Sequence, residues 1–74
     1  MYIIVNGETR FISEEALSYE SIVLMAGRKP DRILTVVYST RRKGDEQREG
    51  TLTPGQSTLI EDGMVFSVAD TSSA

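Results

Sequence analysis

Short apolar runs separated by glycine-containing turns predict strands over much of this chain. Residues 2–5, Tyr-Ile-Ile-Val, form a largely β-branched run that stops at Asn6-Gly7. Asn-Gly is the dipeptide best suited to the two positive-φ positions of a type I′ hairpin turn. The pattern therefore predicts a hairpin in which residues 9–12 return antiparallel to the first strand.

After the hairpin, a period of three to four residues replaces the alternation and predicts one short helix. Residues 13–16 could begin it, but Ser18 is the better N-cap, with Glu20 in the first turn favoured by the helix dipole. The apolar face consists of Tyr19, Ile22, Val23 and Ala26. Gly27 suits the left-handed position after a helix, and Pro30 prevents continuation. A helix of about nine residues covers only one face of a small sheet.

The run at residues 33–38, Ile-Leu-Thr-Val-Val-Tyr, is rich in β-branched residues and predicts the strongest strand. Residues 39–50 follow as a charged loop, which we expect to be solvated because its charges are of both signs. Arg41, Arg42 and Lys43 are candidates for contact with an acidic partner, although a solubilising role is the better interpretation.

Two short segments and a final strand complete the pattern. Residues 51–53 predict a short strand, Pro54-Gly55 a turn, and residues 57–60 a further strand or extended segment. Asp62-Gly63 then turns into residues 64–69. Alternation along this last strand places Met64, Phe66 and Val68 on one face and Val65, Ser67 and Ala69 on the other. We expect the first set to lie in the core.

These elements define an α+β fold of the β-grasp type. A right-handed crossover through the helix places the strand at residues 33–38 in the same sheet as the first strand. The final strand then has one natural position, beside the first strand and parallel to it, in the middle of a mixed sheet of roughly four to five strands. The helix lies across one face. Residues 1–69 form the domain, and residues 70–74 form a flexible C-terminal tail.

The composition leaves little chemistry for catalysis. The 74 residues include no Cys, His or Trp, which removes thiol nucleophiles, thiolate or imidazole zinc sites and the usual proton shuttle near neutral pH. Glu14, Glu15 and Glu20 are better explained as helix-entry charges than as a general acid and base. Ser72 and Ser73 have no histidine to activate them. We expect a non-enzyme without metal or cofactor.

The net charge and the length of the apolar runs argue against nucleic acid and membranes as partners. Eight basic and eleven acidic residues give a net charge of −3, with no basic face that suggests nucleic-acid binding. The longest strongly apolar runs, residues 2–5 and 22–26, are too short to cross a membrane. Met1 is followed by a strand pattern and not by a charged leader. We expect a soluble cytoplasmic protein that binds neither nucleic acid nor membrane.

Several short words in the sequence resemble the bacterial multiubiquitin family. They are Ile-Ile-Val-Asn-Gly at 3–7, Ser-Tyr-Glu at 18–20, Thr-Val-Val-Tyr at 35–38, Gly-Thr-Leu-Thr-Pro-Gly at 50–55 and Asp-Gly-Met-Val-Phe-Ser-Val at 62–68. Their order and spacing carry the resemblance, which extends essentially to Ala69. Members of this family are prokaryotic ubiquitin-like modules, single or in tandem.

The resemblance implies partners and a reactive group. Similar proteins belong to operons with an activating enzyme, a conjugating-enzyme-like protein and a JAB-type metallopeptidase. The C-terminal carboxylate would be adenylated with ATP by the activating enzyme, captured by a cysteine of that enzyme or its partner, and transferred to a target protein through an isopeptide bond. Peptidase processing or removal is part of the same implication.

The residues at the chain's end suit that chemistry. A carboxylate in water is a poor acyl donor, so the terminus must enter a narrow site that excludes water, and only thin residues can follow it. Ser72, Ser73 and Ala74 are thin, although they depart from the Gly-Gly of ubiquitin, and Asp70 and Thr71 complete the tail. Ala74 is the working terminus, or the chain is a precursor or an arbitrary piece, or a peptidase trims it. The plainer interpretation is a frayed end.

A ubiquitin-like module also needs a docking surface. With the first strand's odd positions in the core, Ile4 and Val65 lie on neighbouring central strands on the side away from the helix. Val37 is their expected neighbour on a third strand, and a shift of one residue in register would exchange it for Val36 or Tyr38. Three apolar side chains on a polar sheet face can anchor a partner.

Two other functions fit the sequence. A sulfur carrier of the thiamine or molybdopterin type has a similar fold, Asn-Gly turn and Asp-Gly before the last strand, but typically ends in Gly-Gly, which is missing here. A ubiquitin-like interaction module that is never conjugated would use only its sheet face. The fate of the carboxylate distinguishes them: a thiocarboxylate for the carrier, an adduct on another protein for the modifier, and no role for the pure binder.

Overall fold

The computed structural model describes residues 1–29, 34–40 and 48–70. Within these residues, seven strands and one helix follow one another. They are β1 (Tyr2–Val5), β2 (Glu8–Phe11), β3 (Ala16–Ser18), α1 (Tyr19–Met25), β4 (Leu34–Ser39), β5 (Glu49–Leu52), β6 (Ser57–Leu59) and β7 (Met64–Asp70).

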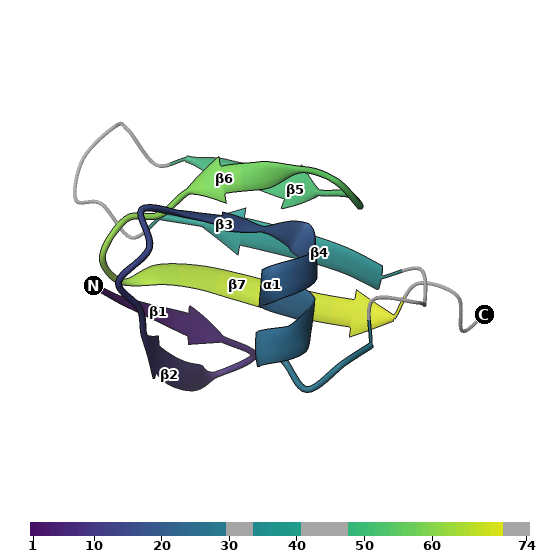
Figure 1. Cartoon of the computed structure of the whole chain (residues 1–74), viewed down its shortest axis with the longest axis horizontal. Coiled ribbons are helices and arrows are strands. Elements are labelled where there is room, and N and C mark those ends of the chain that lie inside the picture. The colour runs from purple at the N-terminus through teal and green to yellow at the C-terminus, as the bar shows by residue number, and fades with distance from the viewer. Residues whose placement is uncertain (30–33, 41–47, 71–74) are drawn as a thin grey trace.

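Five of the strands form one mixed sheet in the order β2-β1-β7-β4-β5. β7 pairs parallel to β1 and antiparallel to β4, so the last strand of the chain is the central one. α1 lies across one face of this sheet (Figure 1). The predicted β-grasp arrangement, with the last strand beside the first, is confirmed.

The first hairpin turns as its sequence predicts. Asn6 has φ 49° and Gly7 has φ 83°, the two positive values that a type I′ turn requires. β1 and β2 then pair with Val5 opposite Glu8 and Tyr2 opposite Phe11. The Asn-Gly dipeptide therefore sets both the turn and the register.

Both ends of α1 follow from local chemistry. Ser18 is the N-cap, and its Oγ accepts a hydrogen bond of 3.2 Å from the Ser21 N–H. At the other end Gly27 has φ 74°, and the N–H of Arg28 donates to the Val23 carbonyl at 3.1 Å. This six-to-one bond belongs to a Schellman motif, which closes the helix. α1 is seven residues long, shorter than the expected length, because the cap takes Ala26.

A small two-stranded ladder between β3 and β6 was missing from the sequence-based prediction. Residues 16–18 were interpreted only as the approach to the helix, yet Leu17 pairs with Thr58 in antiparallel register. The N–H of Tyr19 continues the contact by donating to the Gln56 carbonyl at 2.8 Å. Three residues are too few for a periodic signal, so only the fold reveals this pairing.

The predicted loop at residues 39–50 is wrong at both ends. β4 continues to Ser39, and β5 already begins at Glu49. Between them, the Thr40 Oγ1 accepts a hydrogen bond of 2.8 Å from the Arg48 N–H, and Thr40 is buried. The polar residues at these positions complete a hairpin ladder. Arg41, Arg42 and Lys43 lie outside the described residues.

The core lies between α1 and the inner face of the sheet. Its fully buried members include Tyr19, Ile22 and Val23 from the helix and Ile3, Val36, Met64 and Phe66 from the strands. Leu17, at the position before the N-cap, and Ile22 are both buried, as their hydrophobic-staple spacing predicts. The helix and three strands distant in sequence therefore share one apolar cluster.

Tyr19 ties the helix to the start of β4. Its hydroxyl accepts a hydrogen bond from the Leu34 N–H and donates one to the Leu34 carbonyl, both at 3.2 Å. β5 pairs with β4 from Val36 onward, so Leu34 lies beyond the end of that ladder. The buried hydroxyl supplies the backbone partners that β5 does not reach.

We expect Tyr19→Phe to lower the free energy of unfolding by about 1–3 kcal/mol, because it leaves a buried N–H and carbonyl unpaired. Urea denaturation followed by circular dichroism measures the change. Tyr2→Phe is the matched control, since the Tyr2 side chain is partly exposed and its hydroxyl has no hydrogen bond within the described part of the chain. Its loss should stay within about 0.5 kcal/mol. Equal losses for the two variants would contradict the role assigned to Tyr19.

Candidate functional site

β7 is the strand that leads to the chain's end. It pairs with β1 from Met64 to Phe66 and with β4 from Val65 to Asp70. It ends at Asp70, one residue beyond the predicted strand. The remaining residues of the candidate tail, Thr71, Ser72, Ser73 and Ala74, lie outside the described residues. What the structure supplies is the base from which those residues continue: a strand in the middle of the sheet.

Asn6 holds β7 at the point where β1 ends. Its backbone N–H donates to the Phe66 carbonyl at 3.0 Å. Its side chain accepts a 2.8 Å hydrogen bond from the Val68 N–H at Oδ1 and donates from Nδ2 to the Val68 carbonyl at 3.2 Å. The sequence pattern predicts Asn6 only as a turn residue. Its side-chain contact joins residues 62 positions apart, which no local pattern reveals.

The outer face, which we define as the sheet face turned away from α1, carries the candidate docking residues. Ile4 and Val65 are direct neighbours in the parallel ladder of β1 and β7, and both are half-buried. Val37, on β4, lies opposite Ser67 of β7 and is 45% exposed. Its neighbour Val36 is fully buried. The structure thus places Ile4, Val65 and Val37 on one face, and their role in docking stays a prediction.

Two aromatic residues extend this apolar area. Tyr2 pairs with Phe11 across β1 and β2, with ring centroids 6.4 Å apart. Phe11 is 84% exposed and Tyr2 is partly exposed. Phe11 is not among the predicted docking residues, although strand alternation across the predicted hairpin places it on this face. We call Tyr2, Ile4, Phe11, Val37 and Val65 together the outer patch.

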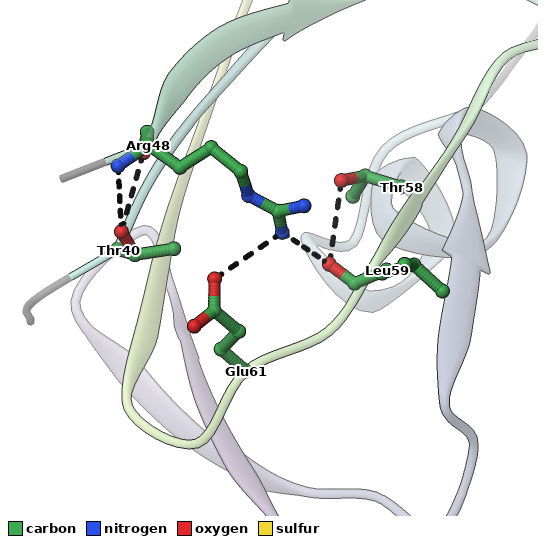
Figure 2. Close-up of polar contacts among 5 residues, drawn as sticks. All are labelled: Thr40, Arg48, Thr58, Leu59 and Glu61. Carbon is green, nitrogen blue, oxygen red and sulfur yellow. Dashed lines mark hydrogen bonds and ion pairs between the residues drawn. The ribbon is translucent and has the colours of Figure 1, made fainter. Parts of the chain in front are cut away.

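On the other side of the molecule, Arg48 organises a cluster of polar contacts (Figure 2). Its Nη2 donates to the Leu59 carbonyl at 2.8 Å and lies 3.4 Å from a carboxylate oxygen of Glu61. Its guanidinium carbon also lies 5.9 Å from the centroid of the Tyr38 ring. Arg48 therefore links β5, the end of β6 and the core side of β4, which makes it a packing residue.

Beside this cluster is an open hollow of about 570 Å³, lined by Met1, Glu15, Arg48, Leu59, Ile60 and Glu61. The two carboxylates and the guanidinium mix charges of opposite sign along apolar walls. The guanidinium already binds the Leu59 carbonyl and a carboxylate oxygen of Glu61 through Nη2, and these contacts hold Arg48 in the wall of the hollow.

Of the acidic residues considered for catalysis, Glu20 makes a structural contact. The Glu20 carboxylate accepts a hydrogen bond of 3.1 Å from the Gly55 N–H, so it fastens the turn before β6 to the start of α1. Within residues 1–29, 34–40 and 48–70, no three acidic side chains are grouped so that they could hold a metal ion. No helix in the described part of the chain has the length and apolar character needed to span a membrane.

Comparison with known proteins agrees with this architecture. The family model described as multiubiquitin matches residues 1–72. No curated protein and no solved structure shows a significant match. The family match spans both strands that border β7 as well as β7 itself, and it confirms the resemblance inferred from the short words in the sequence. Because it covers nearly the whole chain, this ubiquitin-like domain belongs to the multiubiquitin family.

Proposed function

We propose that this domain is a protein modifier whose C-terminal carboxylate is activated by an ATP-dependent enzyme and joined to a target protein. The observation that carries the proposal is the position of β7. The strand that leads to the C-terminus is central, with a partner strand on each side. A protein that grips the sheet therefore also fixes the place from which the chain's end continues.

The chemistry proceeds in three displacements. The carboxylate attacks the α-phosphorus of ATP and releases pyrophosphate, giving an acyl adenylate. A cysteine thiolate of the activating or conjugating protein then displaces AMP and forms a thioester. An amine of the target finally displaces the thiolate to form an amide bond. In this proposal the described part of the domain binds the enzymes and holds the chain's end in place.

The outer patch is the surface that we assign to the activating enzyme. Its apolar side chains lie on the two central strands and their neighbours, and Val65 belongs to β7 itself. Hot spots of protein interfaces are enriched in large side chains near the centre of a patch, with polar groups around them. Thr9, Ser67 and Thr51 provide such polar positions on the neighbouring strands.

A conjugating protein and a metallopeptidase complete the proposed system. The peptidase trims the chain's end or removes the domain from its target. Within this chain, the amines available to accept the acyl group are those of two lysines, Lys29 and Lys43, and the amino group of Met1. The target protein and the linkage are properties of those partners. The domain contributes a recognisable body and a carboxylate.

The docking surface is tested by substituting Ile4 and Val65 together with Arg. We expect affinity for the activating enzyme of the same genome to fall at least about thirtyfold, because the loss of two central contacts is typically worth 2 kcal/mol or more. Isothermal titration calorimetry measures the affinity. The melting transition should stay nearly unchanged, because both side chains lie on the outer face.

The matched control is Leu24→Arg with Leu59→Arg, which adds the same charge at exposed apolar positions outside the outer patch. It should bind as the unaltered chain does. If the Ile4 and Val65 variant unfolds, those residues belong to the core, and Val37→Arg, at an exposed position of the patch, then decides whether this face binds. Unchanged affinity of the Val37→Arg variant would contradict the assignment of the outer patch to the activating enzyme.

The reactive group is tested by amidating the C-terminus of the full chain, which removes the carboxylate and nothing else. ATP–pyrophosphate exchange by the activating enzyme should disappear, while binding to that enzyme stays within about twofold because the outer patch is intact. A second variant lacking residues 71–74 keeps all of β7, since the strand ends at Asp70. It should behave in the same way.

Mass spectrometry of the complete reaction distinguishes the alternatives. An adduct on another protein supports the modifier, and a thiocarboxylate on this chain supports a sulfur carrier. If amidation changes neither exchange nor any adduct, the domain is a binding module that is not conjugated.

A further inference from the structure

The side chain of Asn6 takes the place of a strand residue. The backbone leaves the sheet at this point, because Asn6 and Gly7 both have positive φ and turn toward β2. The carboxamide of Asn6 instead faces back to β7, where it binds both the N–H and the carbonyl of Val68. A side-chain amide carries N–H donors and a carbonyl acceptor on one carbon, so it can bind the N–H and the carbonyl of one residue together. It therefore extends the ladder of β1 and β7 beyond the last paired residue.

The position of this contact matters for the end of the chain. The parallel ladder pairs Val5 with Phe66, and β1 has no later residue in the sheet. Without Asn6, the Val68 backbone would have no partner on that side. β4 continues on the other side of β7, where Thr35 faces Ala69 and Leu34 faces Asp70. Val68 is thus the last residue of β7 at which the strand has a hydrogen-bonding partner on its β1 side.

We propose that Asn6 is a positioning residue that sets the point where the chain's end leaves the rigid body of the domain. This inference rests on the proposed function, in which an enzyme draws the C-terminus into its active site. With Asn6 in place, such an enzyme can peel Ala69 and Asp70 away from β4 alone, but to release Val68 it must also break the two hydrogen bonds with Asn6. Asn6 fixes the reach of the segment that follows Val68.

The residue type supports this role. Asn tolerates a positive φ, which the turn requires, and its amide both donates and accepts. Asp keeps the shape and the tolerance of positive φ but offers only acceptors when ionised. Gly fits the turn and has no side chain. Asn6→Gly therefore removes the contact with Val68 while it preserves the hairpin.

Amide hydrogen exchange, measured by NMR on the full chain, tests the proposal. The informative amide is Ala69, which Asn6 does not contact. Alternation along the strand directs the Ala69 N–H toward β4, because the Val68 N–H faces Asn6. We expect Asn6→Gly to raise exchange at Ala69 roughly tenfold, since loss of the hydrogen bonds at Val68 frees the strand end to fray. Ser67 should change little.

The control is Asp62→Ala at the opposite end of the same strand pair. The carboxylate of Asp62 accepts a hydrogen bond of 2.9 Å from the Tyr2 N–H, so this variant also removes a side chain that binds backbone. It should leave exchange at Ala69 unchanged. Asn6→Asp keeps an acceptor for the Val68 N–H and loses only the donor to the Val68 carbonyl, so it should raise exchange at Ala69 by less than Asn6→Gly does. It replaces that variant, with this smaller expected rise, if Asn6→Gly does not fold.

Digestion of the full chain with a broad-specificity carboxypeptidase gives a second measurement. We expect trimming of the unaltered chain and of Asp62→Ala to stop before Val68, and trimming of Asn6→Gly to continue past it. Equal stopping points together with equal exchange at Ala69 would overturn the proposal and leave Asn6 as a turn residue. A uniform rise of exchange at Ile3, Ser67 and Ala69 would also overturn it, because it would indicate general destabilisation.

Both measurements omit the activating enzyme. They can therefore support the role of Asn6 even if amidation shows that the carboxylate is not activated. Conversely, an activated carboxylate with no effect of Asn6 would leave the proposed function standing without this positioning residue.

Discussion

The structure depends on β7 having a strand on each side. The parallel ladder with β1 and the antiparallel ladder with β4 join the two ends of the chain to its middle. They pair backbone groups that would otherwise lie unsatisfied beneath α1. Met64, Phe66 and Val68 are buried as a consequence. If β7 were removed, β1 and β4 would separate and the inner face of the sheet would open to water.

This constraint connects stability with the proposed activity. A carboxylate that reacts in another protein's active site needs a flexible approach, but it also needs a body that the other protein can orient. The central position of β7 satisfies the second need, since the outer patch includes Val65 from that strand. Contacts made to the sheet therefore fix the direction in which the chain leaves it.

Polar side chains complete the backbone pairing wherever the short strands stop. Asn6 binds Val68 beyond the end of β1, and Tyr19 binds Leu34 beyond the end of β5. Arg48 binds the Leu59 carbonyl at the end of β6 (Figure 2). In a domain this small, each unpaired buried group is a large fraction of the total stability. These polar side chains therefore extend the hydrogen bonding of strands that are only three to seven residues long.

Features that depend on neighbouring residues could be predicted from the sequence. The Asn6-Gly7 turn, the Ser18 cap and the Gly27 stop follow from backbone preferences of one or two residues, and hydrophobic alternation identified the last strand and its buried side. Chain order and crossover handedness then left one place for that strand. The β3–β6 ladder and the contact between Asn6 and Val68 were decided only by the tertiary structure. They pair segments about 40 and 60 positions apart, and no local preference reports which distant group will complete a hydrogen bond.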